Sequence, residues 1–423
     1  MQLKTLLLLF FLLSAKAFYV LSQTITIDDC HKKAEANYPA IIRFDIIEKT
    51  KEYNIANANK AYLPQGTLSA NGTWQSDVTS IPIEMPGLQI PTIDKDQYRI
   101  VAELNQIIWD GGRVSAQKRS LEANAELDKS QLKNEIYTII ERVNNLYFGI
   151  LLMKEQLNQL AILEGQIQRN YKDVQTYIQN GLANETDLNI IRIEQLKTGQ
   201  QRVNMESNLE AYIQMLSVMI GEQLNSDFIF VKPNPVTSLT IDVINRPEIL
   251  MFEAQQNALE SQKSLLSAKI MPTIGLFAQG GYGKPGLNMF DNEFTPYFLG
   301  GVRLSWNFSN LYTLKSDKRK IDLQKSAVNS QRETFIQNLN IIIPQQQIEI
   351  DKFRKTMKDD DEIIRLHTQI RKVAETKVEN GTMSVSDLMK ELNAEESAKQ
   401  AKVLHEIQFL MSVYSLKYST NQN

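Results

Sequence analysis

The sequence has few of the residues that carry enzymatic or metal chemistry. Its 423 residues include one cysteine and three histidines, and His31, His367 and His405 lie far apart in the chain. This set is too small for a disulfide framework, a zinc site or an iron–sulfur cluster. The chain also lacks a P-loop, a Rossmann glycine pattern and a nucleophile elbow. We therefore predict no catalytic residue, no cofactor and no metal site, and an enzyme is the least favoured class.

An excess of charge of one sign is also missing. The chain has 46 Lys and Arg against 49 Asp and Glu, which gives a formal net charge of −3. A nucleic-acid surface needs clustered positive charge, so we expect no nucleic-acid partner. After residue 22, no segment has the ~20 consecutive apolar residues that a membrane-spanning helix needs.

The N-terminus has the pattern of a secretory signal peptide. Lys4 gives a positive start, and Leu6–Leu13 is an apolar run that is too short to cross a bilayer. Ala15-Lys16-Ala17 and Val20-Leu21-Ser22 are both plausible cleavage sites, and we assign residues 1–22 to the signal. An exported chain of this kind is periplasmic, secreted, or an outer-membrane β-barrel protein.

The strongest pattern is an internal duplication. Tyr38–Phe44 matches Arg246–Phe252, and Tyr62-Leu63-Pro64 matches Ile270-Met271-Pro272, both at an offset of 208 residues. The offset becomes 200 for the later matches: Val101–Leu104 with Gly301–Leu304, Asn180-Gly181 with Asn380-Gly381, and Asp187-Leu188 with Asp387-Leu388. Chance agreement at separate places in register is improbable, and the period is too long for a solenoid. We predict two structural repeats, 23–221 and 246–423, joined by a segment at 222–245.

Each repeat has the same predicted order of elements. An opening helix, at Ile25–Ala61 and Glu248–Lys269, ends just before a proline. Two strands, a very long helix and a return helix follow. The predicted strands are about 65–77, 97–109, 272–284 and 296–309, the long helices 111–180 and 312–380, and the return helices 184–221 and 384–418.

The strands alternate polar and apolar residues. Thr67 and Ser69 alternate with Leu68 and Ala70, for example, and each strand has the length that a tilted strand needs to cross a bilayer. A soluble β-sandwich with one polar face would have the same pattern, and the strands alone favour that alternative.

The long helices have coiled-coil character. The first contains no proline between Gly112 and Gln179, and its apolar residues step by three and four. At ~1.5 Å per residue, about 65 residues extend for about 100 Å, more than a compact domain can hold. In the second long helix, Pro344 is expected to cause a kink or a local gap in hydrogen bonding.

Four strands cannot close a barrel alone, because unpaired edges in a bilayer leave backbone groups without partners. The barrel must then be closed by several copies of the chain. The order of elements, written twice, resembles the TolC family of outer-membrane factors over nearly the whole mature chain. The resemblance is carried by Pro39 and Pro247 in the opening helices, Leu63-Pro64 and Met271-Pro272 before the strands, Trp109–Arg113, and the two Gly-x5-Asp-Leu turns. Trp306–Tyr312 departs from the family's Asp-Gly-Gly pattern, which predicts a different turn at the second barrel exit.

The resemblance implies a mainly α protein with membrane β-structure. Three chains, each giving four strands, would form a 12-stranded barrel in the lipid of the outer membrane, with a long α-helical tunnel in the periplasm. Such homotrimers dock through a periplasmic adaptor (a membrane fusion protein) to an inner-membrane RND or ABC transporter. They serve tripartite efflux or type I secretion, and they catalyse no reaction.

The resemblance also implies a docking site at the helical turns. In the family, a Gly-Leu and a Gly-Thr pair meet the adaptor, and these pairs are Gly181-Leu182 and Gly381-Thr382 here. The alternative is that both glycines only cap the long helices.

A channel constriction is the second implied site. The family closes its tip with acidic side chains, and Asp387, with Asp187 at the twin position, matches this pattern. The alternative is a helix-starting role for each aspartate, and this alternative is the favoured one for Asp187. Lys390 and Met383 stand where the family has a second acid and an arginine, so we expect the closed state to be held in another way.

Two further interpretations concern the acidic run and the class of protein. Lys358–Glu362 is interpreted as a solvated helix face, with an acidic band in the lumen as the alternative. A soluble periplasmic or secreted coiled-coil interaction protein with a small β-domain is the alternative to a channel.

Overall fold

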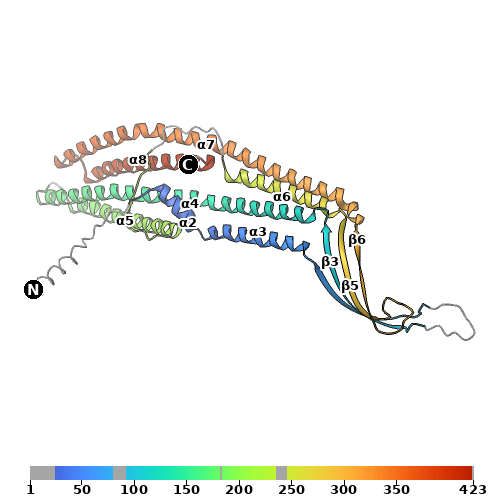
Figure 1. Ribbon diagram of the computed structural model, residues 1–423. Helices are drawn as coiled ribbons and strands as arrows, with labels where there is room; N and C mark the ends of the chain where they lie inside the picture. Colours follow the sequence, from blue (N-terminus) through green and yellow to red (C-terminus); the bar gives the residue numbers. More distant parts are fainter. Residues whose placement is uncertain (1–23, 80–91, 182, 235–244, 422–423) are drawn as a thin grey trace, which may run out of the picture. The chain divides into compact units, whose positions relative to one another are not determined.

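The computed structural model describes residues 24–79, 92–181, 183–234 and 245–421 (Figure 1). The predicted signal peptide and Leu182 lie outside the described residues. The chain divides into two units, each built from segments of both repeats. Unit 2 contains residues 42–132 and 248–334, and unit 1 contains the described residues on either side of these two segments.

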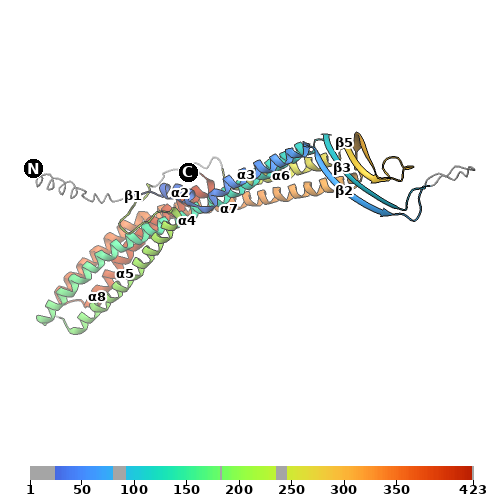
Figure 2. The ribbon, with the colours of Figure 1, turned by 60° about the horizontal axis from the view of Figure 1, so that its bottom comes forward.

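Unit 2 combines four helical segments with one sheet. Helix α3 (Arg43–Asn59), helix α6 (Pro247–Lys269) and the first parts of α4 (Arg113–Gln179) and α7 (Leu311–Glu379) run together (Figures 1 and 2). Ion pairs join neighbouring helices: Lys129 with Glu48 (2.6 Å), Lys263 with Asp322 (2.6 Å) and Lys325 with Glu260 (2.7 Å). A short 3-10 helix, η2 (Lys60–Tyr62), leads from α3 to the first strand.

The sheet of unit 2 is antiparallel and has four strands. These are β2 (Gln65–Trp74), β3 (Asp96–Trp109), β5 (Thr273–Lys284) and β6 (Thr295–Ser305), in the spatial order β2-β3-β5-β6. The two hairpins, one from each repeat, join along β3 and β5, with an irregularity in register between Ile107 and Trp109. Strands β2 and β6 form the two outer edges of this sheet, so among the described residues each has one side without a strand partner.

Unit 1 consists mainly of two long helical hairpins. In the first, α4 is followed by α5 (Glu185–Ile220); in the second, α7 is followed by α8 (Val385–Thr420). The predicted mainly α fold with four strands and an internal duplication is confirmed. No helix in the described part of the chain is both long enough and apolar enough to span a membrane.

The prediction of one opening helix at Ile25–Ala61 was wrong. The structure has β1 (Thr24–Ile25), α2 (Ile27–Asn37), η1 (Pro39–Ile42) and then α3. Proline lacks an N–H and restricts the residue before it, and Tyr38 accordingly has extended backbone angles (φ −64°, ψ 123°).

The segment between the repeats supplies a strand that the sequence analysis missed. Strand β4 (Ile229–Phe230) pairs in parallel with β1. The buried Tyr147 hydroxyl lies 2.9 Å from the carbonyl oxygen of Ile25 and 2.8 Å from that of Val231, so one side chain of α4 ties both strands to the helical hairpin.

Helix α7 continues through Pro344. Because proline has no N–H, the carbonyl of Asn340 loses its usual helical partner, which is the local gap that the sequence predicts. The helix is long on both sides of Pro344, so it continues across this one missing hydrogen bond.

Candidate functional site

Both helical hairpins turn through a glycine in the left-handed region. Gly181 has φ +75° and Gly381 has φ +67°, a conformation that strains any residue with a Cβ. No atom lies within 4 Å of the place where a Cβ would be at either glycine. The turns are therefore open surfaces as well as helix caps, so the docking role and the capping role are compatible.

Thr382 takes part in closing helix α7. Its backbone N–H and its hydroxyl both donate to the carbonyl oxygen of Lys377, over 2.9 Å and 3.0 Å. The Thr382 side chain is thus oriented by the helix end, and Thr382 and Gly381 are both exposed.

Asp187 belongs to the capping box that starts α5. The Asn184 side chain accepts hydrogen bonds from the N–H groups of Thr186 (2.8 Å) and Asp187 (3.2 Å). In return, the Asp187 carboxylate accepts from the N–H of Asn184 (3.1 Å). These bonds satisfy N–H groups that the helix itself leaves free. The structure therefore shows a helix-starting role for Asp187, which is partly exposed.

Asp387 is held by two neighbours at the start of α8. The Lys390 ammonium donates to one carboxylate oxygen (2.9 Å), and the Ser384 hydroxyl donates to the other (2.7 Å). The bond from Lys390, followed by the bond from Ser384, holds the pKa of the exposed Asp387 carboxyl below its usual range. Asp387 is therefore ionised at neutral pH, and Lys390 compensates part of its charge.

A shared apolar core joins the ends of the two hairpins in unit 1. It contains Leu160, Leu163, Ile167 and Val174 of α4, Ile191 of α5, Ala374 and Val378 of α7, and Val385, Leu388, Met389 and Leu392 of α8. Met383 packs against this core. The position where the family pattern has an arginine thus contributes an apolar contact instead of an ion pair.

The interpretation of Lys358–Glu362 as a solvated face was wrong for one residue. Asp360 is only 5% exposed and lies 3.0 Å from the Nδ1 atom of His405 on α8. Asp361 pairs with Lys402 of the same helix (2.5 Å). These two carboxylates therefore bind α7 to α8, while Glu362 pairs with Arg365 on the outside of α7.

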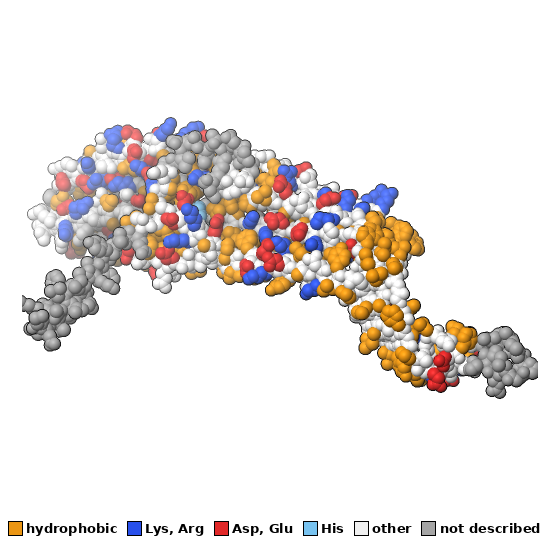
Figure 3. Space-filling model, in the orientation of Figure 1, with side chains coloured by type: hydrophobic (Ala, Val, Ile, Leu, Met, Phe, Trp, Pro, Cys, Tyr) orange, Lys and Arg blue, Asp and Glu red, His pale blue; other side chains and the backbone are white. Residues whose placement is uncertain are grey.

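The four strands place polar and apolar side chains on opposite faces of the sheet. The register sets Leu68 beside Ala102, Leu276 beside Val302, and Thr67 beside Glu103. The apolar face carries Leu68, Ala70, Trp74, Tyr98, Ile100, Leu104, Leu276, Tyr282, Phe298, Val302 and Leu304. Hydrophobic side chains gather over the strands in Figure 3, whereas charged side chains are spread over the helices. Leu68 is 77% exposed and Phe298 is 72% exposed, so this face needs an apolar environment.

The polar face contains an ion pair that the sequence analysis did not find. Arg303 donates to the carboxylate of Glu103 (2.9 Å) and to the side-chain oxygen of Asn105 (3.1 Å). The Arg303 guanidinium also lies over the Phe277 ring, 4.5 Å from its centroid. Glu103 and Arg303 occupy equivalent positions in the two repeats, 200 residues apart. The duplication was visible in the sequence, but their contact depends on the strand order.

The two strand exits turn differently, as the sequence predicted. After β3, the buried Asp110 side chain accepts from the N–H groups of Gly112 (2.9 Å) and Val114 (2.6 Å) and starts α4. After β6, the Asn307 side chain accepts from the N–H of Ser309 (3.2 Å) and starts the 3-10 helix η3 (Phe308–Asn310).

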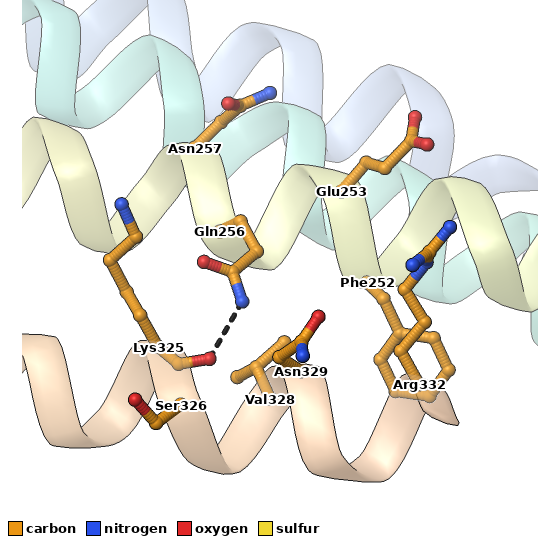
Figure 4. Close-up of a pocket in the computed structure, with 9 residues that line it drawn as sticks. All are labelled: Phe252, Glu253, Gln256, Asn257, Lys325, Ser326, Val328, Asn329 and Arg332. Carbon is orange, nitrogen blue, oxygen red and sulfur yellow. Dashed lines mark hydrogen bonds between the residues drawn. The ribbon is translucent and has the colours of Figure 1, made fainter. Parts of the chain in front are cut away.

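A groove of about 710 Å³ lies between α6 and α7 in unit 2 (Figure 4). Gln256 donates its side-chain amide to the backbone carbonyl of Lys325 (2.8 Å) across this groove. Lys325 in turn pairs with Glu260, so these polar groups connect the two helices. Within the described part of the chain, no three His, Cys, Asp or Glu side chains come together as a metal site requires.

The sequence model of the outer membrane efflux protein family matches residues 32–222. Three similar solved structures are VceC from Vibrio cholerae (11% identity, TM-score 0.68), the CmeC outer membrane channel of Campylobacter jejuni (14%, 0.65) and the MtrE outer membrane channel of Neisseria gonorrhoeae (14%, 0.65). Each alignment covers 93% of this chain, and 95%, 85% and 87% of the other chain, in that order. No curated protein is significantly similar in sequence.

The fold and the family match agree. The structural alignments extend over both repeats and show a TolC-like fold, and the sequence match covers most of the first repeat. Residues 32–222 thus match the outer membrane efflux protein family, in agreement with the resemblance to the TolC family that the sequence predicted. The family is one of outer-membrane proteins, which agrees with the predicted location in the outer membrane with the helical part in the periplasm.

Proposed function

We propose that this protein is the passive exit duct of a tripartite efflux pump or a type I secretion system. The observation that carries the proposal is the four-stranded sheet, which has one apolar face, one polar face and two free edges. Three copies would pair β6 of one protomer with β2 of the next and close a 12-stranded barrel with a polar interior. The chain would act as a conduit without catalysis, and an inner-membrane RND or ABC transporter would supply the energy.

We further propose that the helical turns dock a periplasmic adaptor. Gly181 and Gly381 leave their backbone open to a partner, and the apolar core beneath them fixes the two turns together. We expect Leu182→Asp to weaken cross-linking to the adaptor while the trimer stays intact. Gly199→Ala, a change in the middle of α5 with open space around it, is the matched control. Equal cross-linking by Leu182→Asp and the control would contradict docking at the turns.

We propose Asp387, together with Asp187, as the acidic ring that narrows the periplasmic end. Both aspartates are partly exposed at helix starts beside the turns. Three copies of a carboxylate at a narrow point would favour cations. Lys390 compensates part of the charge of Asp387, so the expected cation preference is weaker than for an unpaired acidic ring.

Single-channel conductance of the purified mature protein in planar bilayers tests the duct and the constriction together. We expect small discrete openings for the wild type and larger ones for Asp387→Ala. Unchanged openings would keep the duct and leave Asp387 with its helix-starting role. A protein that never enters the bilayer would instead favour the soluble coiled-coil alternative.

A further inference from the structure

The loop between β5 and β6 presents apolar side chains at the end of the sheet that is remote from the helices (Figure 1). It covers residues 285–294. Four of its large side chains are roughly half exposed: Leu287 (59%), Met289 (49%), Phe290 (53%) and Phe294 (47%). A soluble loop of ten residues normally carries polar side chains at such positions, so the composition needs an explanation.

A tight turn puts two of these side chains at the tip of the loop. The N–H of Asp291 donates to the carbonyl of Asn288 (3.2 Å), and the Asn288 side chain accepts from the N–H of Phe290 (3.2 Å). Met289 and Phe290 are therefore the central residues of a β-turn. Both side chains are about half exposed at this turn.

The loop is continuous with the apolar face of the sheet. The Phe294 ring stacks on Tyr282 (centroids 5.6 Å apart) and on Tyr98 (6.4 Å). By register, both tyrosines belong to the apolar face, in line with Ile100 and Phe298. The last aromatic residue of the loop thus extends that face beyond the strands, toward the turn.

The base of the loop is tightly packed. Pro285 and Gly286 are buried, and a Cβ on Gly286 would collide with the Thr295 hydroxyl. The Asn292 side chain accepts from the N–H of Asp94, and Lys284 pairs with the Asp94 carboxylate (2.6 Å). These contacts hold the loop in position, so its apolar tip does not need to be ordered at the moment of binding.

We propose that the β5–β6 loop inserts Met289 and Phe290 into the outer leaflet of the membrane. The partner is lipid, at the boundary between headgroups and acyl chains. Aromatic residues at strand ends prefer this depth, and the stack of Phe294 on Tyr98 and Tyr282 directs the turn to the lipid side rather than to the polar interior. The proposal rests on the proposed function, because it takes the apolar face as the lipid-facing wall of a barrel.

Site-directed spin labelling of the trimer in phosphatidylcholine vesicles tests the proposal. The only native cysteine, Cys30, is fully buried, so single cysteines can be introduced into the wild-type sequence, with the unmutated protein as the background control. Labels are placed at Met289 and Phe290. Leu68→Cys on the apolar face and Ser69→Cys on the polar face are the matched references, and each label is probed with oxygen and with a water-soluble nickel chelate.

We expect the labels at Met289 and Phe290 to have the same accessibility as the label at Leu68→Cys, which is high for oxygen and low for the nickel chelate. Labels that follow Ser69→Cys would overturn the proposal but leave the barrel intact. Labels protected from both reagents would also overturn it, because the loop would then be covered by protein. If Leu68→Cys itself is accessible to nickel, the proposed function fails, and the lipid contact of the loop fails with it.

Discussion

At the residue scale, the pair of Glu103 and Arg303 shows how charge is managed on the polar face of the sheet. The Arg303 side chain is 50% exposed and that of Glu103 is 21% exposed, and an ion pair of this kind contributes about 0–1 kcal/mol. Its contribution to stability is therefore small. In the proposed barrel, the pair would add one charge of each sign per protomer to the lumen wall, and therefore no net charge.

Removing one partner of this pair should change ion selectivity. Glu103→Gln leaves the Arg303 charge uncompensated in each protomer, so we expect a shift toward anions. Arg303→Gln leaves Glu103 and should shift selectivity toward cations. The measurement is the reversal potential in a potassium chloride gradient. The double variant Glu103→Gln/Arg303→Gln is the control and should return to the wild-type value. If both single variants shift in the same direction, the pair does not face the conducting path.

Residue contacts were the least predictable part of the candidate site. The alternation of polar and apolar residues in the strands was visible in the sequence, but the contact of Glu103 with Arg303 was not, because it depends on the strand order β2-β3-β5-β6. The burial of Asp360 could not be read from an acidic run, since it depends on which face of α7 is covered by α8. The contact of Met383 with the shared apolar core was also hidden, because the sequence gives the type of this residue but not its neighbours.

At the element scale, the turn after β3 depends on two consecutive glycines. Gly111 has φ +68° and Gly112 has φ +82°, both in the left-handed region. They differ in their surroundings, because a Cβ on Gly111 would collide with Met271, whereas no atom lies within 4 Å of a Cβ on Gly112. The two positions therefore separate backbone strain from close packing.

Alanine substitutions at these two glycines should have unequal effects. Gly112→Ala adds only the strain of the left-handed conformation, about 1–2 kcal/mol. Gly111→Ala adds the same strain and also forces Met271 aside, so we expect the larger loss. The temperature at which the purified oligomer dissociates in detergent measures both. Equal shifts for the two variants would show that the packing against Met271 adds nothing.

Elements were more predictable than contacts, and the exception has a local cause. Strand alternation at Thr67–Trp74 and the Asn-Gly ends of the long helices depend on the chain's own periodicity and caps. The prediction of one opening helix was wrong because good helix formers on both sides of Pro39 hid the break that this proline causes. The strand β4 was missed because two residues at 229–230 have no period and gain their structure from pairing with β1.

At the scale of the whole molecule, the two edges of the sheet determine how the chain can assemble. Both edge strands have more than nine residues, and their unpaired N–H and C=O groups face outward on an otherwise amphipathic sheet. In a bilayer, each unpaired group would cost several kcal/mol. The duplication explains the even number of strands but does not close the sheet. Closure must come from other copies, and this can be tested directly.

Cysteine pairs across the two edges should trap the assembly. We expect one residue of β2 (Thr67, Ser69 or Asn71) to cross-link with one residue of β6 (Leu299 or Gly301) of the next protomer under oxidation. All five lie on the face opposite to Leu68, so a correct pair needs only the right register. Denaturing gels should show covalent trimers for the best pair, and monomers for every single-cysteine variant.

The intramolecular pair Thr67→Cys/Glu103→Cys is the internal reference, because these positions already face each other on β2 and β3. It should form a disulfide within one chain and run as a monomer. Covalent dimers without trimers, at any register, would mean that two copies close the sheet. If no β2–β6 pair reacts while the reference pair does, the edges do not meet and barrel closure by neighbouring copies is excluded. A ladder that ends at the trimer is the outcome that three chains sharing one 12-stranded barrel require, because each of its three interfaces joins the same two edges.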